Sequence, residues 1–177
     1  MDIFTHFIIG ASIGEAAPKD IKNRHAIGAA FALLPDITNL LLVHPYLGWL
    51  AGRTIPFAYA EDFLSHPEIL NHWTYHVWLF SHGLIFWLFF VLPFWRKHRA
   101  APLAIIAYLS HVLMDIPSHT GIYGTQPFYP LPLIFDGWFD AWLWGPLEIL
   151  GSAFFCTCIF LIIRQSRKYW KWESEKI

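Results

Sequence analysis

Five apolar segments, each close to the length of a membrane-crossing helix, dominate the sequence; they are residues 2–17, 25–43, 76–95, 100–116 and 146–163. A helix needs about 20 residues to cross about 30 Å of hydrocarbon, and somewhat fewer where the bilayer is thin. Only 14% of the residues are charged and 56% are hydrophobic, whereas about 25% of the residues in a soluble domain are charged. The pattern predicts an all-α polytopic membrane helix bundle of about five transmembrane helices, folded as a single integral membrane domain over residues 1–177.

Two long connections separate these segments, at residues 44–75 and 117–145. Both contain many prolines, glycines and aromatic residues, and proline and glycine favour turns over continuous helix. We therefore expect outer loops that contain short interfacial helices. The first basic residue is Lys19, and a signal peptide begins with a positively charged region. We therefore expect residues 2–17 to form a retained helix.

The basic residues predict the orientation of the chain. Eleven of the twelve Lys and Arg residues fall at residues 19–24, 96–99 and 164–176, which a five-span chain places on one side of the membrane. The exception is Arg53. Because Lys and Arg concentrate in cytoplasmic loops, the sequence predicts a protein of the inner (plasma) membrane with its N-terminus outside and its C-terminus in the cytoplasm. The net charge of −1 gives no reason to expect nucleic-acid binding.

Five ionisable residues lie inside the apolar segments: His6, Asp36, His82, His111 and Asp115. Such groups cost roughly a few kcal/mol each in hydrocarbon, so they usually face the bundle interior and serve a function. In the predicted topology all five lie nearer the outer end of their segments, and a common depth is what a shared site requires. His111 and Asp115 are four residues apart, so they share one helix face.

Imidazole and carboxylate groups together predict a divalent metal site, with zinc as the first candidate and room for one or two ions. Asp36 is the candidate for a carboxylate that bridges two ions. His119 and Glu148 fall at the same outer level and are candidates for a catalytic acid or base, or for further ligands. Each residue alone also has a simpler interpretation, as a polar contact between helices or, for Asp36, as the partner of a kink at Pro35.

The chain resembles the bacterial membrane-bound metal-dependent hydrolases. The resemblance rests on Thr5-His6 with Gly10, Leu34-Pro35-Asp36, Ser81-His82-Gly83-Leu84, Ser110 to His119, Pro127 and Tyr129-Pro130-Leu131. The order His, Asp, His, His-x-x-x-Asp is also similar to part of the pattern of zinc-dependent phospholipase C. That likeness implies that Asp36 bridges two ions and that His111 and Asp115 bind one of them. The late His-x-x-x-Glu of the phospholipases is missing, so a third ion is not implied.

These observations lead to a metal-dependent hydrolase as the first functional hypothesis. It would act on a phosphoester or ester of a lipid-like substrate at the non-cytoplasmic membrane face, with the lipid bilayer and this small-molecule substrate as its partners. A non-enzymatic membrane scaffold or partner-binding protein with a structural metal site is the alternative. A transporter is a third hypothesis, but the inner halves of the segments offer no matching ionisable residues for a polar path. No oligomeric state is predicted.

Overall fold

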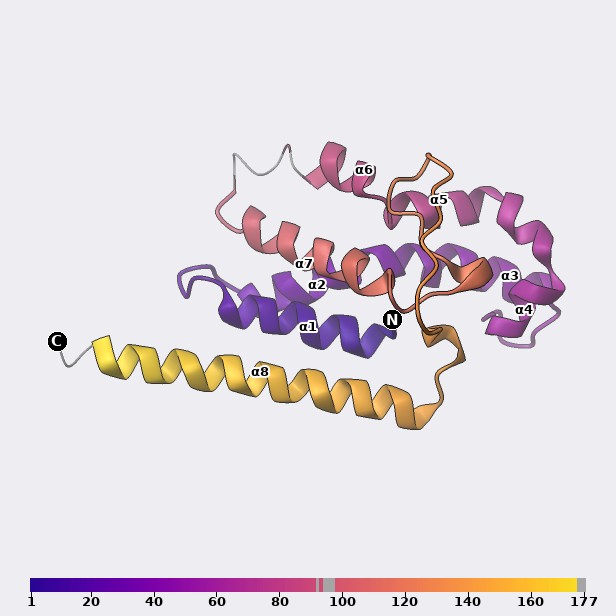
Figure 1. Ribbon diagram of the computed structural model, residues 1–177. Coiled ribbons are helices and arrows are strands. Elements are labelled where there is room, and N and C mark those ends of the chain that lie inside the picture. The colour runs from indigo at the N-terminus through magenta and orange to yellow at the C-terminus, as the bar shows by residue number, and fades with distance from the viewer. Residues whose placement is uncertain (92, 94–97, 175–177) are drawn as a thin grey trace.

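Helices make up the framework of the protein, as the sequence predicted. The computed structural model describes residues 1–91, 93 and 98–174, and within these residues it contains no strand, only an isolated bridge between Thr125 and Phe135. Four helices run side by side in Figure 1: α1 (Ile3–Ala16), α2 (Arg24–Thr38), α7 (Ala101–Asp115) and α8 (Pro146–Ser174). Helix α1 packs against the other three, and α2 also packs against α7.

The second apolar segment forms a longer helix than predicted. Helix α2 continues through a π-helical turn at Asn39–Val43 into α3 (His44–Leu50). The predicted end at residue 43 was therefore wrong, and the first part of the predicted loop 44–75 is helical. Pro45 had suggested a helix end, but it falls in the first turn of α3, where a proline is tolerated.

The third predicted segment, 76–95, is interrupted. It consists of α5 (Trp73–Ser81), α6 (Leu84–Phe86) and a π-helical turn at Trp87–Val91. The break lies at His82 and Gly83, where the backbone N–H of Leu84 donates a hydrogen bond to the carbonyl of Pro127 at 2.7 Å. The outer connection therefore satisfies a donor that a continuous helix would have used itself. The predicted end of the segment, at residues 92, 94 and 95, lies outside the described residues.

Helix length supports a membrane protein but does not confirm five spans. Two helices are long and apolar enough to cross a bilayer, Arg24–Leu50 and Pro146–Tyr169. Helices α1 and α7 are apolar but shorter, and the third predicted segment is broken. Helix α8 begins at the predicted residue and runs eleven residues beyond the predicted end at 163.

Small residues allow α1 and α2 to pack closely. A Cβ atom added to Gly10 would lie 2.4 Å from the carbonyl oxygen of Gly28 and 2.6 Å from the Cβ of Ala32. A Cβ atom on Gly28 would lie 2.1 Å from the carbonyl oxygen of Gly10. No side chain larger than hydrogen fits at either position without moving a backbone, which is how small residues bring membrane helices together. This contact sets the distance between the helices that carry His6 and Asp36.

A separate aromatic core lies under the outer connections. It includes residues from α3, α4 (Ala60–Ser65), the 3₁₀ helices at Pro67–Asn71 and Gly121–Tyr123, and α5. Its buried members are Val43, Leu47, Ala58, Phe63, Ile69, Tyr75, Trp78, Leu79 and Tyr123. The predicted short helices in the outer loops are thus present among the described residues, and they pack into a core of their own.

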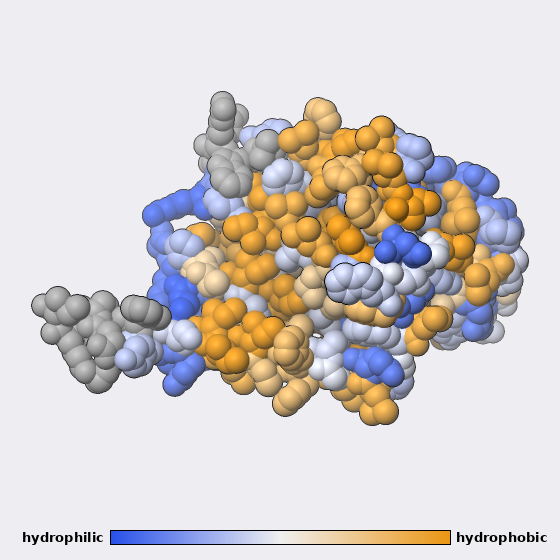
Figure 2. All heavy atoms as spheres, in the orientation of Figure 1, coloured by the Kyte–Doolittle hydropathy of each residue, from blue (hydrophilic) through white to orange (hydrophobic). Residues whose placement is uncertain are grey.

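Helix α8 presents apolar side chains away from the bundle. Leu147 is 81% exposed, and Phe154 and Ile162 are exposed along the same helix. Figure 2 shows an apolar band across the middle of the molecule and hydrophilic atoms at its left end, where the turn between α1 and α2 lies. A continuous exposed apolar surface of this kind suits contact with lipid better than contact with water.

Candidate metal centre

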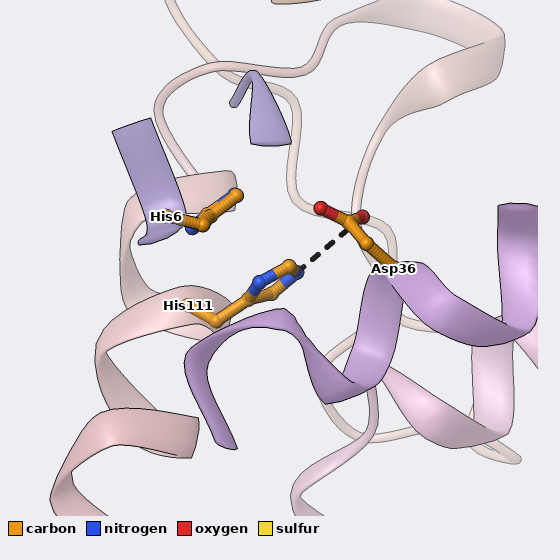
Figure 3. Close-up of side chains that lie close together, drawn as sticks. All are labelled: His6, Asp36 and His111. Atoms are coloured by element: carbon orange, nitrogen blue, oxygen red, sulfur yellow. Dashed lines mark ion pairs between the residues drawn. The ribbon is translucent and has the colours of Figure 1, made fainter. Parts of the chain in front are cut away.

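The five ionisable residues of the apolar segments meet at one end of the bundle. His6 comes from α1, Asp36 from α2, His82 from the end of α5, and His111 and Asp115 from α7. His6, His82, His111 and Asp115 are buried. Figure 3 shows His6, Asp36 and His111 converging from three separate helices. The common depth predicted from the sequence therefore corresponds to a common place in the structure.

The Nε2 atoms of His82 and His111 face each other in this centre. His111 Nδ1 lies 2.6 Å from the carbonyl oxygen of Ala32, and His82 Nδ1 lies 3.0 Å from that of Trp78. A carbonyl can only accept, so both Nδ1 atoms carry the proton that is donated. In the neutral rings both Nε2 atoms are then lone-pair acceptors. These two acceptors lie only 3.1 Å apart, and either a metal ion between them or a proton on one of them would relieve the repulsion of their lone pairs.

The carboxylates add to this concentration of acceptors. Asp115 Oδ2 lies 3.0 Å from His111 Nε2 and 3.6 Å from His82 Nε2. Around zinc, bonds of about 2.0–2.1 Å place tetrahedral ligand atoms about 3.3 Å from one another. The three separations in this group are 3.0, 3.1 and 3.6 Å. The three side chains are therefore spaced as three ligands of a tetrahedral ion would be. The backbone carbonyls hold both rings through Nδ1, which is how the second nitrogen of a metal-bound histidine is usually held.

Asp36 faces the same two rings from another direction. Its Oδ1 lies 3.7 Å from His82 Nε2 and 3.8 Å from His111 Nε2, and Figure 3 marks its ion pair with His111. With His6 and His111 it forms a second three-residue group whose ligand atoms all lie within 4.8 Å of one another. The two groups share His111, so the geometry offers donors for one ion or for two.

His6 completes the ring of imidazoles. Its ring stacks on that of His111 with 3.7 Å between centroids, and its Nε2 lies 3.0 Å from Asp115 Oδ1. The amine of Met1 lies 2.5 Å from the same carboxylate oxygen. His6 Nδ1 is buried and has no hydrogen-bond partner among the described residues. One buried nitrogen of His6 is thus left over for a further contact.

A cavity of about 300 Å³ opens beside the centre. Asp36, His82 and His119 line it, together with the aromatic side chains of Trp78 and Trp142. His82 and the carboxylate of Asp36 are therefore accessible from a space large enough for a small polar group with an apolar neighbour. Such a concave site, mostly apolar and with a few converging polar groups, is the usual form of a small-molecule site.

His119 lies where an acid or base could act, although it has left helix α7. Its Nδ1 donates to the carbonyl of Ser118 at 2.6 Å, and the residue is buried against Trp142. Burial lowers the pKa of His119 to about 4. The ring is therefore neutral at pH 7, and its Nε2 lone pair can accept a hydrogen bond although the ring is a weak base.

Glu148 does not join the centre in the described part of the chain. It is exposed in the first turn of α8, and its Oε2 accepts a hydrogen bond from the backbone N–H of Gly145 at 2.9 Å. That contact is typical of a carboxylate that caps a helix N-terminus. Helix capping accounts for Glu148 without a catalytic role.

The sequence analysis missed two contributors. Asn39 lines the cavity, and its buried Oδ1 has no partner among the described residues. It lies three residues after Asp36, so helical spacing could have identified it. The carbonyl of Ala32, which holds His111, could not have been identified, because every residue carries such an acceptor.

Comparison with known families assigns the chain to one family. The model of the YdjM inner membrane protein family matches residues 1–174. The chain belongs to this family. It is therefore an integral protein of the inner membrane, as the apolar segments predicted. The family description names neither a metal nor a reaction, so the resemblance to metal-dependent hydrolases and to phospholipase C gains no support from it. No curated protein and no solved structure matches the chain.

Proposed function

We propose that the chain is a metal-dependent hydrolase that cleaves a phosphoester or ester of a lipid-like substrate at the outer face of the inner membrane. The observation that carries this proposal is the 3.1 Å approach of His82 Nε2 and His111 Nε2, with both Nδ1 atoms bonded to carbonyls. Two facing lone pairs beside two carboxylates form a site for a divalent cation, and zinc suits nitrogen and oxygen donors together.

Accessibility favours a catalytic site over a closed structural one. Catalytic zinc sites have three protein ligands and an open position, whereas structural sites have four protein ligands. His82, His111 and Asp115 supply three ligands, and the side chain of Asp36 is 20% exposed toward the cavity. A bound zinc ion would acidify water and stabilise the negative charge that develops during hydrolysis. His119, neutral and lining the same cavity, would accept a hydrogen bond from the attacking water and orient it.

The surroundings of the cavity favour a substrate with an apolar part. Leu40, Phe57, Trp78 and Trp142 line it beside the polar groups. Aromatic side chains are common at the level where lipid headgroups meet the acyl chains. A lipid-like ester would place its polar bond against the histidines and its apolar part against these rings.

We also propose the five-span topology, with the metal centre on the outer side. The arrangement of the helices supports it, since Figure 1 places the turn between α1 and α2, the start of α7 and the far end of α8 at one end of the molecule. Most basic residues fall in these places. The metal centre and the outer connections lie at the opposite end.

Metal analysis of the purified protein tests the proposal. We expect at least one zinc ion per chain, lost in His111→Ala and retained in His66→Ala, a loop histidine that pairs with Glu68. Hydrolysis of a panel of phospholipids and lipid esters should follow the metal content. A metal content below one ion per chain that His111→Ala leaves unchanged would contradict the proposal of a metal-dependent hydrolase.

The complete burial of His111 favours a second candidate, a membrane scaffold with a structural metal. In that case zinc would stabilise the protein, but no substrate in the panel would be cleaved. Substitution of His119 separates the two candidates, because His119→Gln should abolish hydrolysis with little loss of metal only if the site is catalytic.

A further inference from the structure

A second cavity lies at the opposite end of the bundle from the metal centre. It has a volume of about 450 Å³ and is bounded by α1, the start of α2 and the second half of α8. Five permanently cationic side chains line it, and they come from three separate parts of the chain: Lys19, Arg24, Arg164, Arg167 and Lys168. A single carboxylate, that of Glu15, lines it with them. The cavity therefore holds an excess of four positive charges.

Internal contacts hold the inner part of this basic cavity in place. Glu15 is buried and accepts hydrogen bonds from Arg24 at 2.9 Å and from His25 at 2.6 Å. Arg167 donates to the carbonyls of Glu15 and Ala17 at the end of α1. These contacts neutralise the one carboxylate and fix two guanidinium groups, so the wall of the cavity is rigid and positively charged.

The remaining cations have no such partners. Lys19, Arg164 and Lys168 line the same cavity, are exposed, and have no hydrogen bond or ion pair among the described residues. Asp20, a nearby acid, is already paired with Arg99 at 2.6 Å. No acidic side chain among the described residues pairs with these three cations. Their positive charge is therefore available to bind an anion from outside the chain.

The floor of the cavity is apolar. Ala11 and Phe160 line it on the side toward the middle of the helices, next to the exposed apolar surface of α8. The change from cations at the end of the bundle to apolar side chains further in matches a molecule with an anionic head and an apolar tail. Basic pockets between membrane helices bind phosphate-bearing lipid headgroups for this reason.

We propose that this basic cavity binds the phosphate group of an anionic membrane lipid. Recognition comes from the guanidinium and ammonium groups of α8 and of the α1–α2 turn, with the acyl chains along Phe160 and the apolar face of α8. Free phosphate carries the same recognised group, so the two sources are separated by experiment. The site is independent of the metal centre and of any hydrolysis there.

Lipid binding by the full-length purified protein tests the proposal. The probes are dioctanoyl phosphatidylglycerol, dioctanoyl phosphatidylcholine and inorganic phosphate, each titrated in neutral detergent and followed by native mass spectrometry and thermal unfolding. We expect saturable binding of one phosphatidylglycerol per chain and much weaker binding of phosphatidylcholine. Saturable binding of inorganic phosphate at the same residues would also support the phosphate site and would assign it to the free anion.

A pair of matched single variants separates the cavity from general surface charge. Lys168→Gln removes one unpartnered cation from the cavity and should weaken phosphatidylglycerol binding roughly fivefold, since each basic side chain contributes about one kcal/mol. The control, Lys22→Gln, removes the same charge and residue type outside the cavity and should change binding less than about twofold. Equal losses in both variants, or no saturable binding of either probe, would overturn the proposal. Unchanged unfolding temperatures without lipid show that both variants fold.

Discussion

His82 Nε2 lies 3.1 Å from His111 Nε2, while the other nitrogen of each ring is held by a backbone carbonyl. Without a metal, one of the rings must take up a proton to separate the two lone pairs. A divalent ion at the proposed site would remove this conflict, and because it would bind only the folded protein, it should stabilise the fold.

We therefore predict that chelation lowers the unfolding temperature. An ion at 100 times its dissociation constant stabilises by about 2.7 kcal/mol, which corresponds to roughly 5–10 °C for a chain of this size. Thermal unfolding in detergent, with a chelator and then with added zinc, measures the effect. His82→Ala should unfold at the same temperature in both conditions, whereas His66→Ala should respond like the wild type. A wild-type protein insensitive to chelator would contradict the prediction.

The two carboxylates should differ in importance. Asp115 lies 3.0 Å from both His6 and His111 and 3.6 Å from His82, whereas the nearest ion-pair distances of Asp36 are 3.7 and 3.8 Å. We expect Asp115→Asn to raise the zinc dissociation constant by more than about 100-fold, and Asp36→Asn to raise it by about tenfold.

Competition with a zinc-sensitive dye measures both constants. If Asp36 instead bridges two ions, as the sequence pattern suggests, Asp36→Asn should remove one of two ions and leave the other tightly bound. Equal small effects of both substitutions would argue against a metal at this centre.

The contact between α1 and α2 should tolerate no added methyl group. Gly10→Ala would place its Cβ 2.4 Å from the carbonyl oxygen of Gly28, and forced repacking of this kind costs about 1–3 kcal/mol. Because α1 carries His6 and α2 carries Asp36, metal affinity should fall with stability.

Gly151→Ala is the matched control for this substitution. Nothing lies within 4 Å of a Cβ atom at Gly151 in α8, so that change should be neutral or stabilise the helix by up to about 1 kcal/mol. Unfolding temperature and zinc content compare the two variants. Equal stability of both would show that α1 and α2 are not packed as described.

The outer connection should loosen in acid because of Asp62. Its buried carboxylate accepts hydrogen bonds from Arg53 at 2.7 and 3.0 Å and from the backbone N–H of Tyr59 at 2.8 Å. The bonds from Arg53 lower the pKa of Asp62 below its ordinary value of 3.8. A carboxylate with a lowered pKa stabilises the fold above its ordinary pKa, and that contribution is lost as the pH falls through the lowered value.

Hydrogen exchange of residues 53–62, corrected for its intrinsic pH dependence, measures this effect. Protection should be constant from pH 7 to about pH 5 and should fall below about pH 4. Asp62→Asn should lower protection at neutral pH and remove the change in acid. Glu68→Gln, at an exposed site in the same connection, should leave the profile of the wild type. An unchanged acid profile in Asp62→Asn would assign the loosening to other groups.

Reporter fusions test the orientation. Alkaline phosphatase is active only outside the cytoplasm. Green fluorescent protein becomes fluorescent in the cytoplasm but not after export across the membrane in an unfolded state. With the five-span topology, a fusion after Ile177 should give fluorescence and no phosphatase activity. A fusion after Pro132 should give the reverse. Phosphatase activity at both positions would show an even number of crossings between them and would overturn the five-span count.

The sequence predicted the helical class and the membrane location because both depend on local composition. Apolar runs long enough to be helices appear as α1, α7 and α8 within one or two residues of their predicted starts. The ends of the second and third segments were predicted less well. Pro45 and Gly83 carry the same local signal, yet the helix continues past the first and breaks near the second. Tertiary contacts, such as the bond from Leu84 to the carbonyl of Pro127, decide between these outcomes.

The residues of the proposed metal centre could be singled out from the sequence because ionisable groups are rare in apolar segments. Their mutual geometry was not predictable, since sequence spacing fixes only His111 relative to Asp115. The helix contact through Gly10 and Gly28 and the acceptor at Ala32 bring the other residues within reach. Glu148 satisfied the same depth criterion, but depth says nothing about direction, and its side chain turns back to cap its own helix.

The helix from Arg24 to Leu50 has 27 residues and is therefore about 40 Å long, which exceeds the hydrocarbon thickness of about 30 Å. Its last turns, together with the aromatic core around them, have to stand above the acyl region or tilt strongly within it. Asp36 comes about midway along this rod, roughly 18 Å from its start at Arg24. With Arg24 at the cytoplasmic boundary, Asp36 would lie in the outer half of the hydrocarbon, below the level of the lipid esters. A lipid-like substrate of the proposed centre would reach it by moving sideways in its own leaflet and lowering its polar bond below the headgroup level. The substrate would not have to be lifted into water, and the polar side chains of the centre would replace the water that its ester or phosphoester loses.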